Sequence, residues 1–322
     1  MTYRDEQPAQ ASKTAVFIPN LNGGDRLMRC LESLDRQTTR PEVVVVDNGS
    51  TDASAERAAE RFNGVHVIGL DENFGFGTAL NKAVKESPGP ENLILLNNDT
   101  ECEPNFVAAL LACADPGTAM VAGVLLQERR PDLIDSAGIQ ADRTLMGFDY
   151  LHDVPVGRLE MAAAPLGPTG GAALYRRAAF EEVGGFDERI FLYFEDLDLA
   201  LRLRAAGGSC SLATDARALH SFSETLGPRS ATKYSHTGWS RAYMMRRYGV
   251  LRHPRLAFRA VSAEAVVCAG QLLLDRTTAG LRGRLNGWRE SAGLSRRDLP
   301  DRFLLNLSLA EHLRLRRRRR LT

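Results

Sequence analysis

The apolar run from Leu93 to Leu96 leads directly into Asn97, Asn98 and Asp99. Such a run is typical of a buried strand, and Asn and Asp are good turn formers, so a strand end alone accounts for the polar residues. Two amides and a carboxylate at the mouth of a buried strand can also hold a ligand. Asp99 offers the oxygen that hard cations such as Mg²⁺ take, usually together with phosphate oxygens, so we expect it to be a metal ligand.

A second acidic group opens a stretch with helical features further along the chain. Glu195 and Asp196 precede four alternate leucines, and Asp198 stands four residues before Arg202, with which it can pair. Acidic residues at a helix N-terminus favour the helix dipole, which explains one of them without catalysis. Because two adjacent carboxyl groups raise the chance that one keeps an elevated pKa, the pair is a candidate general base.

The elements that must position these residues alternate along the first hundred residues. Short apolar runs predict strands at 14–19, 43–46, 65–70 and 93–96, and helical spacing predicts helices at 25–37, 53–62 and after the Gly-rich loop that begins at residue 71. Strands and helices that alternate at this pace predict an α/β fold, with a mostly parallel sheet covered by helices on both faces.

Polar residues gather where each predicted strand ends. The clusters are Asn20, Asp47 to Ser50, Asp71 to Asn73, and Asn97 to Asp99. Ligands of open α/β sheets bind outside the carboxyl ends of the strands, so four such clusters predict one site along one sheet edge. Turn formation explains any single cluster equally well. No GxGxxG follows the first strand, and no GxxxxGK[ST] is present, so the clusters do not indicate a dinucleotide site or a P-loop.

An acidic site that binds a diphosphate needs a divalent cation between the like charges, and Asp99 is placed to hold it. Five spaced motifs then resemble inverting family 2 glycosyltransferases with the GT-A fold. They are VVVVDNGSTD, ENFGFGTALN, LLNNDTE, PTGGAALYRR and VGGFDERIFLYFEDLDLALRLRAAG. The motifs occur in the family's order within residues 14–225, and NFGFG and GGFDERIFLYFEDLDL resemble bacterial rhamnosyltransferases in particular.

Carried over position by position, the resemblance implies a nucleotide-sugar site in which Asp47 accepts a hydrogen bond from a pyrimidine base. The residues of that site are Pro19, Asn20, Asp47, Asn48, Ser50, Asn73, Gly75, Gly77, Asn97 and Asn98. The resemblance also implies a loop that faces the acceptor and the donor sugar. Its residues are Thr169, Gly170 and Gly171.

The same resemblance implies that Asp196 is the catalytic base, that Glu195 orients it or the acceptor, and that Asp99 and His220 hold Mg²⁺ or Mn²⁺. The family's metal motif begins with Asp where this chain has Asn97, so Asp99 is the surer ligand. A lone histidine after an apolar run is equally a structural residue, and a plain tight turn is the less favoured alternative for the PTGG segment.

Composition places the chain among ordinary soluble proteins. It has 322 residues, of which 44% are hydrophobic and 25% charged, and a mean hydropathy of −0.23. The five cysteines are scattered without a CxxC pair, which fits a reducing cytosol better than a disulfide framework or zinc site. A polar N-terminus predicts no signal peptide, and the lack of a run of about 18 apolar residues predicts no transmembrane helix.

Charge is divided unevenly along the chain. Residues 1–240 carry 22 Lys+Arg against 34 Asp+Glu, a net of −12, whereas residues 241–322 carry 19 Arg against 6 Asp+Glu, a net of +13. We therefore expect a flexible N-terminus at 1–13, a GT-A domain at 14–239 and an Arg-rich helical extension at 240–322. Three interpretations of the extension stay open: packing on the domain, docking on an anionic membrane, and, least favoured, nucleic-acid binding, for which no motif is present.

The function expected from the sequence is the inverting transfer of a sugar, L-rhamnose from dTDP-rhamnose in the first place, to a glycan or lipid-linked glycan in cell-envelope polysaccharide synthesis. We expect the enzyme in the cytoplasm or on the inner face of the cytoplasmic membrane, without nucleic acid. The alternatives are transfer of galactofuranose or N-acetylglucosamine from a UDP donor, a sugar nucleotidyltransferase, and a non-catalytic sugar-binding protein.

Overall fold

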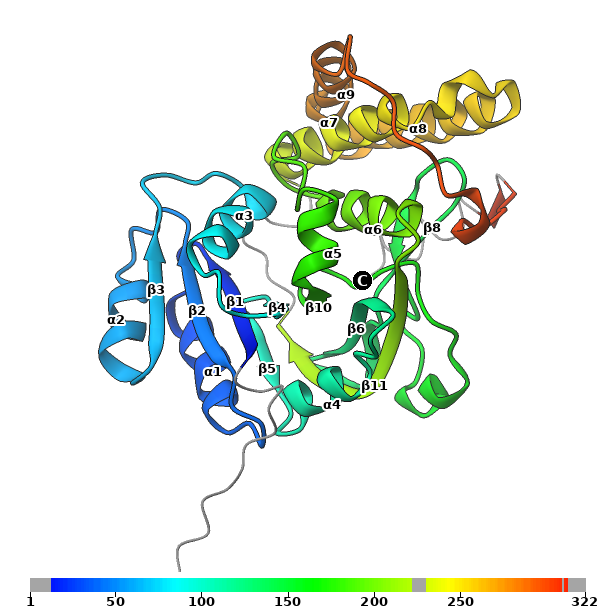
Figure 1. The fold of residues 1–322 in the computed structure, drawn as a ribbon. Helices are drawn as coiled ribbons and strands as arrows, with labels where there is room; N and C mark the ends of the chain where they lie inside the picture. Colours follow the sequence, from blue (N-terminus) through cyan, green and yellow to red (C-terminus); the bar gives the residue numbers. More distant parts are fainter. Residues whose placement is uncertain (1–12, 222–229, 309, 312–322) are drawn as a thin grey trace, which may run out of the picture.

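The structure, a computed structural model, describes residues 13–221, 230–308 and 310–311. A nine-stranded sheet lies at its centre, helices cover both faces, and further helices follow in the C-terminal region (Figure 1). The predicted α/β fold is confirmed. Two predicted segments, residues 1–12 at the N-terminus and the Arg-rich run at 313–320, lie outside the described residues.

The first four strands of the large sheet are parallel and run in the order β3-β2-β1-β4. Their bounds are β1 Thr14–Asn20, β2 Glu42–Asp47, β3 Val65–Gly69 and β4 Asn92–Leu96. These agree with the predicted bounds to within one residue. In register, Asn20 pairs with Asp47, and Asp47 pairs with Gly69, so the polar ends of neighbouring strands lie at the same edge.

The second half of the sheet is mixed. Strand β10 pairs antiparallel with both β4 and β6, and β11 runs parallel to β6 and antiparallel to β5. The strands here are β5 Thr100–Cys102, β6 Thr118–Gln127, β7 Arg130–Ser136, β10 Ala172–Arg176 and β11 Ser209–His220, with a separate hairpin of β8 Ile139–Ala141 and β9 Gly147–Asp149. The predicted parallel order therefore holds for the first four strands only.

Alternation along the strands divides the core between two faces. Ala15 and Phe17 of β1 point to the face covered by α3, α5 and α6, whereas Val16 and Ile18 point to the face covered by α1, α2 and α4. All four side chains are fully buried, as expected for strands covered on both sides. The helices are α1 Gly24–Asp35, α2 Ser54–Arg61, α3 Phe76–Glu86, α4 Phe106–Ala112, α5 Arg177–Glu182 and α6 Glu195–Ala205.

Three long helices form the C-terminal region and are continuous with the core. They are α7 Ala231–Arg247, α8 Pro254–Leu274 and α9 Ala279–Glu290, and short 3-10 turns occupy Val156–Met161, Val250–Arg252 and Asp301–Phe303. The domain boundary expected at residue 240 falls inside α7. Tyr243, Met244 and Tyr248 belong to the same buried cluster as α3 and α6, so this region packs as part of the domain. Pro254 is the first residue of α8, and Gly280 is the second residue of α9.

Helix α8 differs from the sequence-based expectation about membranes. The chain was expected to have no transmembrane helix, yet α8 has 21 residues and contains an 18-residue window with a mean hydropathy of 1.4, which is long and apolar enough to cross a bilayer by length and composition alone. Only 22% of its apolar window is buried in the protein. A charged residue, Glu264, interrupts the apolar run, which explains why a search for an uninterrupted run missed this helix.

A segment after α9 returns to the domain and holds α6 in place. Arg297 lies 2.7 Å from Asp187 Oδ2 and 2.5 Å from Asp198 Oδ1. Tyr248 donates its hydroxyl to Asp198 Oδ1 over 2.9 Å, and Arg202 approaches the other oxygen of Asp198 at 2.7 Å, so the pair expected from the i,i+4 spacing is present. The carboxylate of Asp198 is fully buried, and the three donors around it compensate for the loss of water.

Candidate active site

Asn20 connects three of the polar strand ends. Its side-chain nitrogen lies 3.0 Å from Asp47 Oδ1 and 3.1 Å from Ser50 Oγ, and its oxygen accepts a hydrogen bond of 2.9 Å from Asn98. Asn20 itself is 1% exposed. The network fixes the ends of β1, β2 and β4 relative to one another, as the shared sheet edge predicts. Pro19 lies next to this network in β1.

A second network shapes the loop before α3. Asn48 donates to Asn73 Oδ1 over 3.0 Å, and its own oxygen accepts from the Phe74 amide at 2.9 Å. Gly75 has φ = +81°, and a Cβ there would collide with the carbonyl oxygen of Phe191. Glycine is required here by backbone conformation and by this close approach. The contact brings the loop after β3 against the loop that precedes Glu195.

The PTGG segment meets both loops. A Cβ on Gly171 would lie 2.9 Å from the side-chain nitrogen of Asn97, and a Cβ on Gly170 would lie 2.9 Å from the ring of Phe76. Backbone contact follows the same path, since the Asn97 amide donates to Gly171 O over 3.3 Å. Thr169 is half-buried at the start of this turn. Gly77 packs against Phe186, so protein contacts account for it without a ligand.

Asp99 has two features expected of a cation ligand: it is buried, and one of its oxygens accepts no hydrogen bond from the described residues. Its exposed fraction is 5%, and the oxygen is Oδ1. A buried carboxylate oxygen without a partner is costly unless a cation or donor reaches it. His220 Nε2 lies 3.5 Å from this oxygen, so the two atoms can contact one ion. Asp99 and His220 therefore fit a divalent cation as two protein ligands. The described residues form no cluster of three or more such side chains, so the remaining ligands of a cation would have to come from outside the protein.

The opposite side of the His220 ring is held by a residue that the sequence did not single out. Its Nδ1 lies 2.6 Å from Asp135 Oδ2 on β7, and His152 Nδ1 contacts the backbone oxygen of Asp135 at 2.8 Å. Burial opposes the charged form, but the hydrogen bond to Asp135 and the negative charge of Asp99 raise the pKa of His220 to about 10, so a cation bound at Nε2 would displace the proton there. Burial likewise opposes ionisation of Asp135, yet the two histidines hold its pKa well below the usual range. The arrangement orients His220 with Nε2 towards Asp99.

Glu195 and Asp196 start α6 after an unusual turn. Tyr193 and Phe194 both have positive φ, 68° and 72°, a conformation that costs non-glycine residues energy and concentrates at functional sites. Glu195 is 8% exposed and its Oε2 has no hydrogen-bond partner among the described residues, whereas Asp196 is half-buried and accepts from the Leu197 amide at 2.7 Å. Burial first, and the charge of Asp196 next, raise the pKa of Glu195 to about 8.

The predicted residues thus lie at one edge of the sheet, connected loop to loop. Asn97 contacts Gly171, Gly170 contacts Phe76, and Gly75 contacts Phe191, four residues before Glu195. The sequence missed Asp135 and His152. An Asp and a His in an ordinary stretch of strand and turn give no local signal. The pairing of β6 with both β7 and β11 brings Asp135 to His220, and His152 contacts the backbone oxygen of Asp135.

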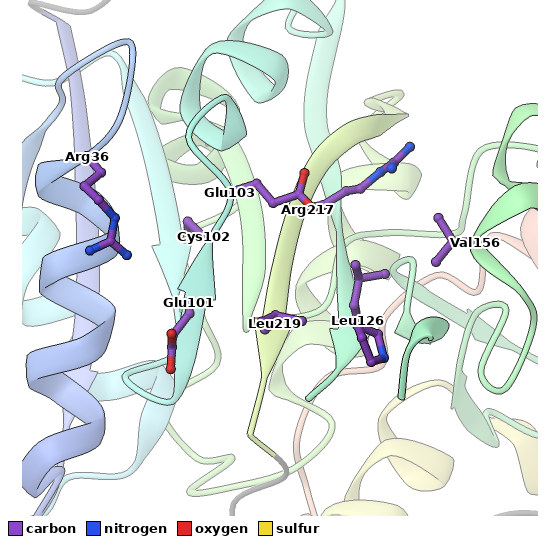
Figure 2. A pocket seen from close by; sticks show the side chains of 9 residues that line it. Arg36, Glu101, Cys102, Glu103, Leu126, Val156, Arg217 and Leu219 are labelled. Atoms are coloured by element: carbon purple, nitrogen blue, oxygen red, sulfur yellow. The ribbon is translucent and has the colours of Figure 1, made fainter. Parts of the chain in front are cut away.

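A surface hollow of about 470 Å³ lies elsewhere, beside β5, β6 and β11 (Figure 2). Its lining residues are Arg36, Glu101, Cys102, Glu103, Leu126, Pro131, Val156, Arg217 and Leu219. None of the residues predicted from the sequence for the site lines this hollow. It is therefore separate from the polar sheet edge.

Comparison with known proteins adds a family to this geometry. The family described as Glycosyl transferase family 2 matches residues 15–184. An N-acetylglucosaminyl-diphospho-decaprenol L-rhamnosyltransferase of Mycobacterium tuberculosis H37Rv is 31% identical over 268 residues, a match that covers 70% of this chain and 86% of the relative. The O-antigen chain rhamnosyltransferase WbaN of Salmonella anatum is 27% identical over 228 residues, covering 69% of this chain and 70% of the relative.

Solved structures share the fold at low sequence identity. GalNAc-T7, crystallised with UDP, GalNAc and Mn²⁺, superposes with a TM-score of 0.63 at 17% identity, covering 88% of this chain and 56% of that one. The mannosyltransferase PcManGT of Pyrobaculum calidifontis, in complex with GDP-Man and Mn²⁺, gives a TM-score of 0.54 at 18% identity and covers 98% and 82% of the two chains.

Proposed function

The chain belongs to glycosyl transferase family 2, and on that premise we propose that it transfers L-rhamnose from dTDP-rhamnose to a lipid-linked glycan, with inversion at the anomeric carbon. The glycosyltransferase class follows from the family. The sugar and the lipid-linked acceptor are proposed from the relative that is 31% identical, whose name gives both. The family match also counts against a sugar nucleotidyltransferase and against a non-catalytic sugar-binding protein.

The observation that carries the mechanism is the pair of acidic centres at one sheet edge. The partnerless oxygen of Asp99, with His220 beside it, supports the donor diphosphate through a divalent cation, Mg²⁺ or Mn²⁺. Such a cation, when bound, neutralises the diphosphate as it departs. The structures of GalNAc-T7 and PcManGT both contain Mn²⁺, which agrees with this assignment but concerns those proteins.

The nucleotide is proposed to lie over the network centred on Asn20. Asp47 accepts a hydrogen bond from an N–H of the pyrimidine, while Asn48 and Ser50 shape the pocket around the base. Asn73 and Asn97 lie on either side of the sugar, towards the acceptor turn at Gly170. Because these side chains already hydrogen-bond one another, little reorganisation is needed before the donor binds.

Proton transfer is assigned to the start of α6. Asp196 takes the proton of the acceptor hydroxyl as its oxygen attacks the anomeric carbon from the face opposite the diphosphate. The bond between sugar and diphosphate breaks, and its electrons leave with the diphosphate. Glu195, whose pKa of about 8 keeps it mostly protonated at neutral pH, does not compete for that proton and can donate a hydrogen bond to the bound acceptor.

A lipid-linked acceptor places the enzyme at the inner face of the cytoplasmic membrane. The net charge of +13 in residues 241–322 supports attraction to anionic lipid. None of the five cysteines, all of which lie within the described residues, takes part in a disulfide, in keeping with the reducing cytosol expected from the sequence.

The experiment incubates the full chain with dTDP-rhamnose, Mn²⁺ or Mg²⁺ and a short-chain prenyl-diphospho-N-acetylglucosamine, and reads the product mass and the configuration of its new bond. UDP-galactofuranose and UDP-N-acetylglucosamine run in parallel. Donor binding is read independently by thermal unfolding, since a ligand at 100 times its Kd adds about 2.7 kcal/mol of stability. Transfer and stabilisation by a UDP sugar alone would refute rhamnose as the donor.

A further inference from the structure

Exposed apolar side chains concentrate on two C-terminal helices. Of the 12 large apolar residues that are exposed in the described part of the chain, nine lie on α8 or α9. We call these nine the α8–α9 apolar face. They are Phe258, Val261, Val266, Leu272, Leu273, Leu274, Leu281, Leu285 and Trp288. Monomeric proteins seldom expose apolar groups gathered in this way unless the surface binds something.

The exposed residues of α8 follow the helical repeat. Phe258, Val261, Ala265, Ala269 and Leu272 are spaced by three or four residues, so they form one stripe along the helix, and all five are exposed. Helices that face water normally carry charged side chains on that side. This stripe carries none over four turns.

The one charge in the second half of α8 points the other way. Between Ala260 and Leu274 the only charged residue is Glu264, which is 6% exposed. Arg241 of α7 donates to it over 2.9 Å, and Arg284 of α9 donates to it over 2.8 Å. These ion pairs fix one side of α8 to both neighbouring helices. A transbilayer position would break them and leave charges buried without partners, so α8 is attached along one side and free along the other.

Helix α9 is divided in the same way. Gly283 and Gly287 lie so close to α7 that a Cβ would collide with the backbone oxygens of Ser235 and Trp239. Leu281, Leu285 and Trp288 lie on its outer side, at i, i+4 and i+7. The glycine side therefore holds the helix against the protein, and the leucine side extends the α8–α9 apolar face.

Positive charge borders this apolar surface. Four exposed arginines flank it, and none of them has a carboxylate partner within the described ranges. They are Arg255, Arg276, Arg282 and Arg289. An apolar face with unpaired arginines at its margin is complementary to an anionic bilayer, where apolar groups enter the acyl boundary and cations meet headgroup phosphates.

The same helices are attached to the acceptor side of the active site. Ser240 of α7 donates to Leu192 O over 3.1 Å, and the His236 ring stacks on Phe191 with centroids 5.0 Å apart. Figure 1 shows α7, α8 and α9 together at one end of the molecule, next to α5 and α6. One helix, α7, thus lies between the loop leading to Glu195 and the α8–α9 apolar face.

We propose that the α8–α9 apolar face lies flat in the interfacial layer of an anionic membrane. The inference deepens the proposed function, from which it takes the lipid-linked acceptor. With α8 and α9 in the headgroup layer, the diphosphate-linked sugar of the acceptor reaches Asp196 while its lipid chain stays in the bilayer. The surface is a docking site for lipid and does not span the membrane.

The test measures binding of the full chain to vesicles of phosphatidylcholine and phosphatidylglycerol in equal amounts, and of phosphatidylcholine alone. The wild type is expected to bind the anionic vesicles at least tenfold more tightly. The triple variant Phe258→Ser, Val261→Ser, Leu273→Ser is expected to lose at least tenfold in affinity with an unchanged Tm. Met161→Ser changes a side chain that is 85% exposed and lies off this face, so it serves as the matched control.

The depth of the α8–α9 apolar face in the bilayer is measured by tryptophan fluorescence. The chain has two tryptophans, so Trp239→Phe leaves Trp288 as the probe on α9. Its emission is expected to shift to the blue on anionic vesicles and to be quenched by lipids brominated near the headgroup more than by lipids brominated at the chain end. Stronger quenching from the chain end would overturn the flat orientation.

Three outcomes would contradict the proposed membrane docking. They are equal vesicle binding by the triple variant and the wild type, no preference for anionic vesicles, and a wild-type dimer in solution that the triple substitution converts to monomers. Transfer to a water-soluble acceptor separates this inference from the proposed function. The triple variant is expected to retain it. If no rhamnose is transferred but the vesicle results hold, the proposed function fails and the docking surface stands.

Discussion

His220 Nδ1 and Asp135 Oδ2 lie 2.6 Å apart, and this contact turns the other ring nitrogen of His220 towards Asp99. Histidine metal ligands almost always donate their second ring N–H to a carboxylate, carbonyl or water. Asp135 has that position here, with His152 on its far side. The residue supports the proposed metal site without contacting substrate, and this role can be tested apart from turnover.

Replacing Asp135 by Asn should weaken metal binding. Loss of an outer partner typically costs about 10- to 100-fold in metal affinity, because the imidazole loses its orientation and part of its basicity. The measurement is the Mn²⁺ Kd of the full chain by electron paramagnetic resonance. Asp132→Asn, on the exposed part of the same strand, is the matched control and should leave the Kd unchanged. An unchanged Kd in Asp135→Asn would assign Asp135 to folding alone.

Replacing Asp99 by Ala should cost more than Asp135→Asn. The variant removes a proposed ligand directly, so Mn²⁺ affinity should fall by more than the roughly 10- to 100-fold of an outer partner, and the donor should no longer bind more tightly when metal is added. Addition of EDTA should abolish transfer by the wild type. Asp115→Ala, an exposed carboxylate, is the control. Full activity of Asp99→Ala in metal-free buffer would contradict the assignment.

The raised pKa of Glu195 predicts a pH dependence of stability. The folded state holds a proton that the unfolded state releases between the ordinary value of 4.5 and about 8, so the free energy of unfolding falls as pH rises through that window. Each tenfold difference in proton affinity between the two states is worth about 1.4 kcal/mol. Glu195→Gln should lose this decrease of the unfolding free energy with pH. Urea unfolding should therefore show the variant to be more stable than the wild type at pH 8. Glu182→Gln, which is exposed, should not.

Much of the donor side of the site was predictable because it depends on local patterns. A buried strand needs four or five apolar residues, and its polar continuation is visible in the next three, as at Leu96 and Asn97. Parallel pairing then brings such ends together without further information. The contacts of Asn20 with Asp47 and Asn98 follow directly.

The rest depended on long-range packing that local patterns do not encode. Strand β10 enters antiparallel between β4 and β6, and β7 brings Asp135 to a histidine 85 residues away. The C-terminal extension was expected to begin at residue 240, with packing on the domain as one of three open interpretations, and Tyr243 is fully buried in the core. In α8, Glu264 interrupts the apolar run in the sequence, yet its side chain lies on the buried side, so the exposed stripe stays uncharged.

Arg297 should contribute strongly to stability because it joins the segment after α9 to α6. Arg297→Met removes a positively charged partner from both Asp187 and Asp198, whose side chains are only 3% and 0% exposed. Removing one partner of a buried pair costs about 3–5 kcal/mol, and the lower value applies because Asp198 keeps Arg202. Urea unfolding of the full chain measures it. Arg296→Met, an exposed neighbour, should change stability little; equal effects would show that the contact is unimportant.

The account is tested most directly by the turnover of Asp196→Asn, measured with the nucleotide Kd. Asparagine keeps the size of the side chain but accepts no proton at neutral pH, and a positioned general base contributes about 10²–10⁴-fold. Turnover should fall by that factor or more while the Kd stays near that of the wild type, and Glu195→Gln should lose less. Wild-type turnover in Asp196→Asn, or a larger loss in Glu195→Gln, would contradict Asp196 as the base.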